Sequence, residues 1–167
     1  MVVYIHNEIG AWTAGPEGTV LMLNGEQEQR SLLETNAELT GPDGAEKYEV
    51  LDGVGSLTGD SFAVINNIPV TEDGREAFEE RFRNRARMVE SEPGFVAIRV
   101  LRPLNGDTYR ILTLWGSEAD FKAWQSSKAY EHAHKKRQTS QGIDQQQPSI
   151  FPRPSFVTTY RVSVSVN

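Results

Sequence analysis

The chain has 167 residues, among them 17 lysines and arginines, 23 aspartates and glutamates, three histidines and no cysteine. This length suits one domain of ordinary size, or one domain with an extension. The absence of thiols excludes disulfide scaffolds, zinc ribbons, iron–sulfur clusters and thiol catalysis. No apolar run reaches the roughly 18 residues that a membrane-spanning helix needs, and the first residues do not resemble a signal peptide. We therefore expect a cytoplasmic protein without a membrane partner.

The net charge of −6 averages two unlike regions of the chain. Residues 1–60 carry eleven acidic and two basic residues, whereas residues 61–167 carry 12 acidic and 15 basic ones. The acidic balance argues against nucleic acid as a partner, and the basic run at 134–137 is too short to reverse that expectation. The slight positive excess after residue 60 is compatible with an anionic ligand.

The first 60 residues predict short strands separated by turns. Asn24-Gly25 lies between two apolar segments and is a hairpin signal. A stretch rich in glycine and serine at 53–61 marks the expected boundary between this region and the rest of the chain. We expect residues 1–60 to form a β-rich extension that is too poor in large apolar side chains to fold alone. Its strand-like segments are 2–5, 19–23 and 30–35.

After residue 60 the hydrophobic patterns predict the order strand, helix, strand, strand, helix, strand. This order is the ferredoxin-like βαββαβ plan, an α+β fold in which helices cover one face of an antiparallel sheet. We expect that domain over residues 61–167. The first helix is predicted from about 74 to 89, with Phe78 and Phe82 on its apolar stripe. The predicted strands are 62–70, 95–101, 108–115 and 155–164.

Two adjacent asparagines, Asn66 and Asn67, interrupt an otherwise apolar strand. Asparagine disfavours strands, and burying an amide without partners costs up to several kcal/mol. Strand alternation places Asn66 on one face with Val64 and Ile68, and Asn67 on the other face. The alternative is a structural role, in which one amide is hydrogen-bonded within the fold and the other marks a bulge.

The second predicted helix carries Trp124, and His134 follows ten residues later. At about 100° per residue the two side chains do not share a face of a straight helix, although Ser126-Ser127 can break it. A single histidine can serve as an axial haem ligand. The alternatives are a surface histidine in a basic run and a tryptophan that packs in the core. The sequence contains no two-histidine metal motif and no serine-hydrolase, P-loop or dinucleotide motif.

Taken together, the segment from residue 62 to about residue 162 resembles the antibiotic-biosynthesis-monooxygenase domain, and within that superfamily the haem-degrading monooxygenases of the IsdG type. The resemblance extends into the first third of the chain for bacillary members that carry a short extension before the domain. The stretches that carry it are 62–68, 92–104, 111–115, 133–137 and 153–160.

The resemblance implies an active site made of Asn66, Trp124 and His134. It implies that His134 ligates the haem iron, that Asn66 hydrogen-bonds from the opposite side, and that Trp124 presses on the porphyrin. Phe78 and Phe82 are candidate pocket walls, with a core role left open for both. Arg85 is a candidate partner for the haem propionates.

The implied activity is haem degradation, in which the porphyrin ring is cleaved oxidatively with O2 and iron is released. Haem would be both substrate and cofactor. Because the chain has no flavin or nicotinamide motif, an external electron donor, a reductase or a small reductant, is an expected partner. The alternatives are a haem carrier or sensor, a signalling protein without turnover like a staphylococcal relative of similar length, and a cofactor-free oxidation of quinone-like aromatics.

Domains of this family usually dimerise face to face. Here the strand-like segments of the first third could cover the sheet within one chain. We therefore expect a monomer rather than a homodimer.

Overall fold

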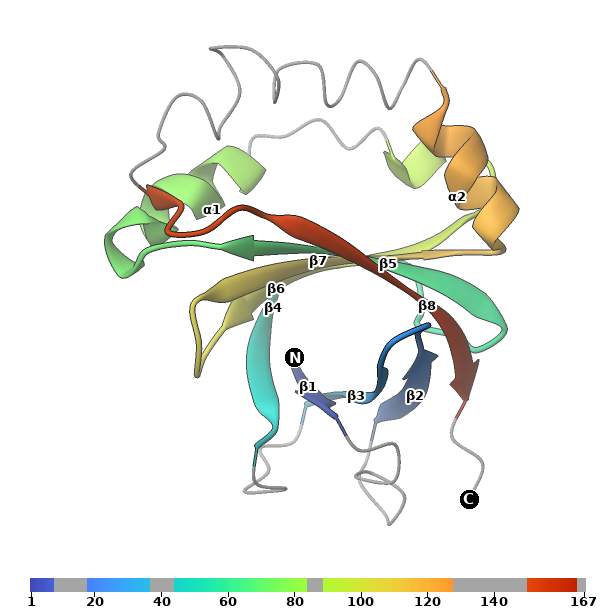
Figure 1. The fold of residues 1–167 in the computed structure, drawn as a ribbon, viewed down its shortest axis with the longest axis horizontal. Helices are drawn as coiled ribbons and strands as arrows, with labels where there is room; N and C mark the ends of the chain where they lie inside the picture. The colour runs from blue at the N-terminus through green and yellow to red at the C-terminus, as the bar shows by residue number, and fades with distance from the viewer. Residues whose placement is uncertain (8–17, 37–43, 84–88, 128–149, 165–167) are drawn as a thin grey trace.

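A computed structural model describes residues 1–7, 18–36, 44–83, 89–127 and 150–164. Within these ranges eight strands pair side by side, all antiparallel, and close a barrel in the order β1-β3-β2-β8-β5-β7-β6-β4. Figure 1 shows β1, β2 and β3 at the bottom of the ring and two helices above its upper wall. The strands are β1 (Val2–His6), β2 (Thr19–Asn24), β3 (Gln29–Thr35), β4 (Glu46–Val54), β5 (Ser61–Pro69), β6 (Phe95–Pro103), β7 (Thr108–Trp115) and β8 (Phe156–Val164).

The second half of the chain has the ferredoxin-like α+β plan. Its elements follow in the order β5, α1 (Arg75–Arg83), β6, β7, α2 (Glu118–Gln125) and β8. Its four strands lie in the order β8-β5-β7-β6. Both helices lie on the outer side of this sheet, over opposite ends of it (Figure 1). The predicted fold class is confirmed.

Side-chain caps begin both helical segments. The Thr71 side chain accepts a hydrogen bond from the Gly74 backbone N–H and begins a short 3-10 turn, Glu72–Gly74, that leads into α1. Ser117 accepts from the backbone N–H of Asp120 at the start of α2. Both satisfy donors that a helix leaves unpaired at its N-terminus.

The structure tests the predicted extent of the first helix only in part. α1 is described to Arg83, Val89–Ser91 is a 3-10 turn, and residues 84–88 lie outside the described part of the chain. Val89 is buried in a cluster with Phe62 and Trp115, whereas Phe78 of α1 belongs to another cluster.

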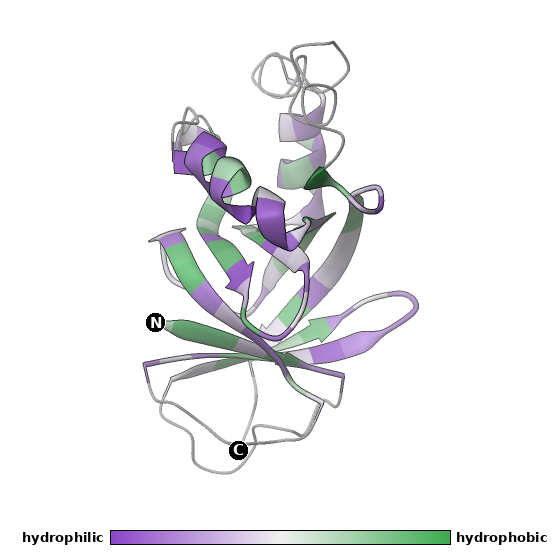
Figure 2. Ribbon diagram, turned by 90° about the vertical axis from the view of Figure 1, so that its left-hand side faces the viewer, coloured by the Kyte–Doolittle hydropathy of each residue, from purple (hydrophilic) through white to green (hydrophobic). Residues whose placement is uncertain are grey.

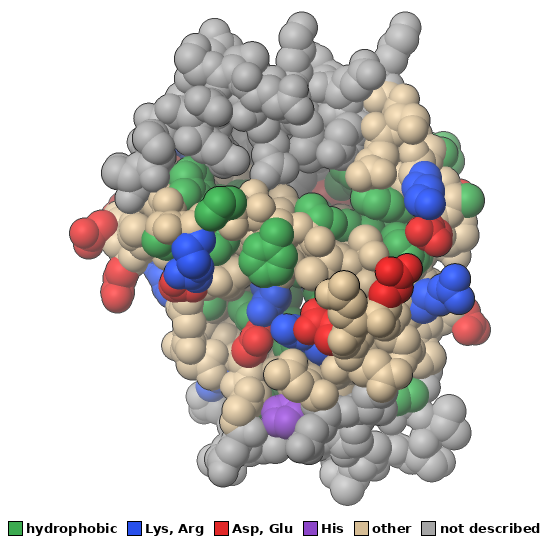
Figure 3. All heavy atoms as spheres, viewed as in Figure 1, with side chains coloured by type: hydrophobic (Ala, Val, Ile, Leu, Met, Phe, Trp, Pro, Cys, Tyr) green, Lys and Arg blue, Asp and Glu red, His purple; other side chains and the backbone are tan. Residues whose placement is uncertain are grey.

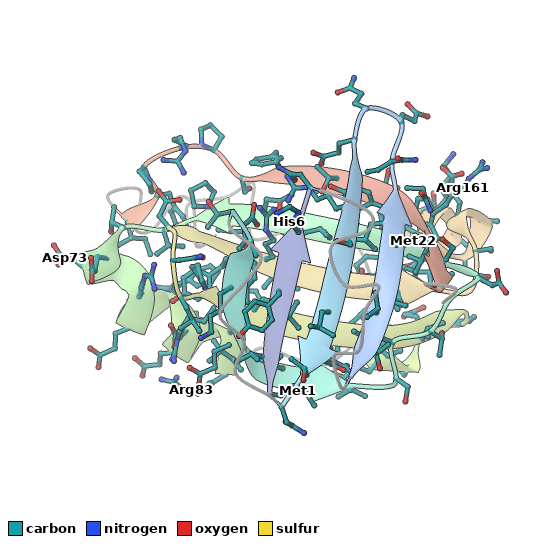
Figure 4. All side chains as sticks on the ribbon, turned by 90° about the horizontal axis from the view of Figure 1, so that it is seen from below. Met1, His6, Met22, Asp73, Arg83 and Arg161 are labelled. Carbon is teal, nitrogen blue, oxygen red and sulfur yellow. The ribbon has the colours of Figure 1, made fainter. Side chains whose placement is uncertain are left out.

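The strands of the first third complete the ring. β2 pairs with β8, β4 pairs with β6, and β1 joins β3 to β4. Figure 4, seen from below, shows these strands crossing in front of the sheet of the second half, with Met1, His6 and Met22 labelled on them. Since each strand has a partner on both sides, the described barrel has no free edge.

Both halves of the chain contribute to the barrel interior. Leu21 and Leu32 meet Ile65, Leu112 and Tyr160 in one buried cluster. Figure 2 shows apolar and polar residues alternating along the strands, as expected when one face of a strand is inside. The first third, lean in large apolar residues, thus shares a core with the later strands instead of building its own.

Two ionic clusters accompany this apolar centre. Arg99 on β6 donates to Glu34 on β3 at 2.5 Å and to the carbonyl oxygens of Val54 and Gly55 at 3.2 and 2.8 Å. Both charged side chains are about nine-tenths buried, at 9% and 10% exposure. A buried ion pair with its donors satisfied in this way connects a strand of the first third to the sheet of the second.

The second cluster is centred on Arg110 of β7. Its guanidinium donates to Glu46 at 2.7 Å and to the hydroxyl of Tyr48 at 2.5 Å, and it also donates to Asn67. Arg30 of β3 forms a longer ion pair with the same Glu46, at 3.5 Å. In the view of Figure 3, basic and acidic side chains lie next to one another in the middle of the face that is drawn.

Candidate functional site

Asn66 lies on the outer face of β5, the face that the helices cover. Its neighbours along the strand on that face, Val64 and Ile68, belong to two apolar clusters that involve α2 and α1, respectively. The Oδ1 atom of Asn66 is buried and accepts no hydrogen bond from any residue that the structure describes. An unsatisfied buried acceptor costs about 1–3 kcal/mol, so this atom is a candidate contact for a ligand.

Asn67 points to the opposite face and is fully buried. Its Nδ2 donates to the carbonyl oxygens of Ile65 and Phe156 and to the hydroxyl of Thr158, at 3.1–3.2 Å, and its Oδ1 accepts from Arg110. Asn67 is therefore the satisfied structural amide. β5 keeps a continuous register with both neighbours through this region, so neither asparagine marks a bulge.

Trp124 lies in the last turn of α2 and is partly buried. Its ring stacks on that of Trp115, with centroids 5.3 Å apart and planes 28° apart. Trp115 is fully buried at the end of β7, and its Nε1 donates to the hydroxyl of Thr113 at 3.2 Å. The packing of Trp124 is thus against a second indole that the sheet holds in place.

On α1 the two phenylalanines differ in exposure. Phe78 is 2% exposed and lies 4.8 Å from the ring of Tyr109, so the structure places it in the core. Phe82, one turn later, is only partly buried and contacts the Phe78 ring at 5.0 Å. Of the two, Phe82 is the side chain with surface left to offer a ligand.

Glu79 anchors α1 to the sheet. Its carboxylate accepts from Arg102 of β6, with the Nε at 2.9 Å, and from the hydroxyl of Tyr109 on β7. The hydrogen bond from Arg102 holds the pKa of Glu79 below its usual value, and burial raises the pKa of Tyr109. These contacts position α1 on the sheet. Because Glu79 is hydrogen-bonded to both Arg102 and Tyr109, its carboxylate has a structural role.

His134 and Arg85 lie outside the described residues. Asn66 and Trp124, by contrast, are brought to the same side of the sheet. Ile111, the partner of Asn66 on β7, packs against both the cluster that contains Trp124 and the one that contains Phe82. Asn66 thus lies at the junction of the two apolar clusters.

Two residues beside Asn66 were not identified from the sequence. Ile111 on β7 and Val157 on β8 are its register partners on either side. Antiparallel partners share a face of the sheet, so both flank Asn66 on the helix side. Alternation alone could have placed each residue on a face, but not in a row with Asn66, because the register of a strand pair is not readable from one sequence.

A separate depression of about 400 Å³ lies at the start of β5, below the N-terminus of α2. Asp60, Ser117 and Arg161 are among its lining residues, whereas Asn66 and Trp124 are not. The described residues contain no group of three or more His, Asp or Glu side chains that could hold a metal ion. Among the helices in the described ranges, none is long and apolar enough to cross a membrane.

Comparison with known proteins adds sequence relatives. The model of the antibiotic biosynthesis monooxygenase family matches residues 61–136. A heme-degrading monooxygenase of Halalkalibacterium halodurans is 33% identical over 91 residues, which cover 53% of this chain and 78% of that protein. A heme oxygenase (mycobilin-producing) of Mycobacterium tuberculosis is 39% identical over 66 residues, covering 39% of this chain and 63% of that protein. The match thus spans less than two thirds of the mycobacterial relative.

A solved structure described as a major regulator of staphylococcal pathogenesis has the same fold. Its TM-score is 0.77 at 19% identity, and the superposition covers 96% of this chain and 98% of the other. The likeness therefore includes the strands of the first third.

Proposed function

This chain belongs to the antibiotic biosynthesis monooxygenase family, and from that premise we propose that it is a haem-degrading monooxygenase. In this proposal haem binds on the outer face of the sheet between α1 and α2. The porphyrin is cleaved with O2 and electrons from an external donor, and iron is released. The observation that carries the proposal is the buried Oδ1 of Asn66, which has no hydrogen-bond partner among the described residues and lies at the junction of two apolar clusters.

The residues around Asn66 fit a flat apolar ligand. Val64 and Ile68 precede and follow it on the same face, and Ile111 and Val157 lie beside it on the neighbouring strands. A binding site with apolar walls and few polar groups is typical for such ligands. The names of the two sequence relatives support haem as that ligand.

We propose a role for each of three residues. The amide of Asn66 can hydrogen-bond a small oxygen-containing molecule between the sheet and the ligand. Trp124 offers a wall to the ring and cannot retreat, because Trp115 backs it. His134, the family's ligand position, would hold the iron as a neutral imidazole. When bound, haem supplies the iron and the ring on which the oxygen chemistry takes place.

The partners follow from the chemistry. Ring opening consumes several electrons, so a reductase or a small reductant must supply them. The haem propionates are anionic, and Arg85 on the segment after α1 is the candidate that we propose to meet them.

A haemin titration with a matched histidine control tests the proposal. We expect the wild type and His132→Ala to give the same Soret band, and His134→Ala to lose or shift it. Asn66→Ala and Trp124→Ala should bind haemin but lose its absorbance slowly in air with ascorbate. An unchanged spectrum in His134→Ala would show that the ligand assignment is wrong.

The same titration separates an enzyme from a carrier or sensor. A haem carrier would keep its Soret absorbance in air with ascorbate or a reductase, whereas a monooxygenase would lose it and release iron that a ferrous chelator detects. A wild type that binds no haemin would contradict both readings and leave a signalling role as the alternative.

A further inference from the structure

Within the described residues, neither α1 nor α2 contributes to an apolar cluster with the outer face of β8. On that face Val157, Thr159 and Arg161 pair with Asn66, Val64 and Phe62 of β5. All three β8 residues are exposed, whereas their β5 partners are buried or partly buried. The two apolar clusters beneath α1 and α2 include residues of β5 and β7, but no described residue of β8. Among the described residues, the candidate site therefore has no apolar cover along β8.

Val157 is an unusual residue to find on that flank. Its side chain is 56% exposed, and it is one of only four large apolar side chains so exposed among the described residues. It is also the residue directly beside Asn66 on β8. An exposed apolar side chain alone means little, but here it adjoins a buried acceptor that has no partner in the described residues.

We propose that Val157 contacts haem and forms the floor of the site on the β8 side of Asn66. This inference rests on the proposed function. Adjacent strands lie roughly 4.8 Å apart, and a porphyrin is wider than that spacing. A ring lying over Asn66 must therefore also cover the residues beside it on the sheet, Ile111 and Val157. Both are apolar, as contact with the face of a porphyrin requires.

The two flanks of Asn66 then have different roles. Ile111 is packed between the clusters of both helices, so its contribution is already fixed by the fold. Val157 packs in neither cluster of the described residues and is exposed, so in this proposal haem covers its apolar surface. A polar or charged side chain at Val157 should therefore weaken haem binding without disturbing the protein that lacks haem.

Phe156 provides a matched control for this test. It precedes Val157 in the chain and is 54% exposed, nearly the same fraction. It pairs with Asn67 rather than Asn66 and therefore lies on the opposite face of the sheet. Val157→Asp and Phe156→Asp introduce the same charge at adjacent exposed positions, but only the first would lie under the porphyrin.

The experiment is a haemin titration followed by the Soret band, together with thermal unfolding of each variant without haemin. We expect Val157→Asp to weaken haemin binding by at least about tenfold, since it places a carboxylate against the ring, and Phe156→Asp to stay within about twofold of the wild type. Should the charge at Val157 prevent folding, Val157→Thr keeps the branched shape that suits a strand and should weaken binding by about threefold or more.

Wild-type affinity in a folded Val157→Asp or Val157→Thr variant would overturn the inference and leave the proposed function intact. An equal loss in Phe156→Asp would also overturn it, because the effect would then not depend on the face of the sheet. If the wild type binds no haemin, the proposed function fails and this inference fails with it.

Discussion

The indole of Trp124 stacks on the indole of Trp115 at 5.3 Å, with 28° between their planes. The first residue belongs to α2, and the second ends β7. Trp115 is further fixed by Phe95 and Phe121, whose rings lie 6.1 and 5.9 Å away. This pair is thus the link between the helix that carries a proposed catalytic residue and the rigid sheet.

We predict that the two tryptophans are energetically coupled. In a double-mutant cycle of Trp115→Leu and Trp124→Leu, the coupling free energy of unfolding should be about 0.5–1.5 kcal/mol, the value typical of aromatic pairs. Denaturant unfolding of the four proteins measures it. Phe78→Leu combined with Trp124→Leu is the control, because Phe78 lies in the other cluster. That pair should be additive within about 0.5 kcal/mol.

The adjacent asparagines should respond to substitution with opposite sign. Asn67→Val removes an amide that has all its partners and leaves Arg110 one acceptor short, so we expect a loss of about 2 kcal/mol in unfolding free energy. Asn66→Val removes a buried acceptor that has no partner in the described part of the chain and introduces a better strand former, so we expect a gain of up to about 1 kcal/mol in unfolding free energy. Urea unfolding of both variants without haemin measures these two changes in free energy. Destabilisation by Asn66→Val would mean that its amide already has a structural partner.

Removing one partner of the buried Arg99–Glu34 pair should lower the free energy of unfolding strongly, whereas replacing both partners by apolar residues should lower it much less. Arg99→Met leaves the Glu34 carboxylate buried without its cation, and the expected loss is about 3–5 kcal/mol. The double variant Arg99→Met with Glu34→Leu should recover most of it, since no charge of this pair is then left buried. Arg153→Met is the control. It breaks an exposed pair with Asp107 and should leave the free energy of unfolding close to that of the wild type.

The stability of the protein should fall in acid, partly through Glu79. Hydrogen bonding from Arg102 holds the pKa of Glu79 below its usual value of 4.5. A lowered pKa means that the folded state favours the carboxylate, so this stabilisation is present above pH 4.5 and is lost as the pH falls through the folded-state pKa. Glu79→Gln should therefore reduce the drop in melting temperature between neutral pH and about pH 3.

An exposed neighbour serves as the comparison for Glu79. Glu80 follows it on α1 and is exposed. We expect Glu80→Gln to keep the acid-induced drop of the wild type. If Glu79→Gln keeps it as well, the contact with Arg102 and Tyr109 does not contribute to the pH dependence.

The fold of the second half was readable from local patterns, whereas the closure of the barrel was not. Alternation and turn residues are local, and they predicted β5 to β8 and the start of α1. The closing pairs are not local: Leu21 pairs with Val164, and Tyr48 pairs with Pro103. Nothing in the short strands of the first third specifies these partners, because their register depends on side chains far along the chain.

The candidate site, too, could be predicted only where local sequence patterns determine it. The face of Asn66 followed from alternation, and the structure agrees. The roles of Asn67, Ile111 and Val157 required the pairing of β5 with its two neighbours. For Trp124 the sequence could not identify its contact, because Trp115 reaches it only after α2 folds back over the sheet.

We predict that the protein is a monomer in solution. Every described strand of the barrel is paired on both sides, so no edge remains for a second copy. The inner face of the sheet formed by β5 to β8 is already covered by side chains from the first third, such as Leu21 and Leu32. A second copy could bind that face only if the first 60 residues were displaced and their shared core exposed to water.

Light scattering coupled to gel filtration measures this oligomeric state. It should give a mass near 18.7 kDa that does not change with protein concentration. A stable mass of twice that value would contradict the prediction of a monomer. The contact would then have to lie on the outside of the barrel, where Val157 leaves apolar surface exposed.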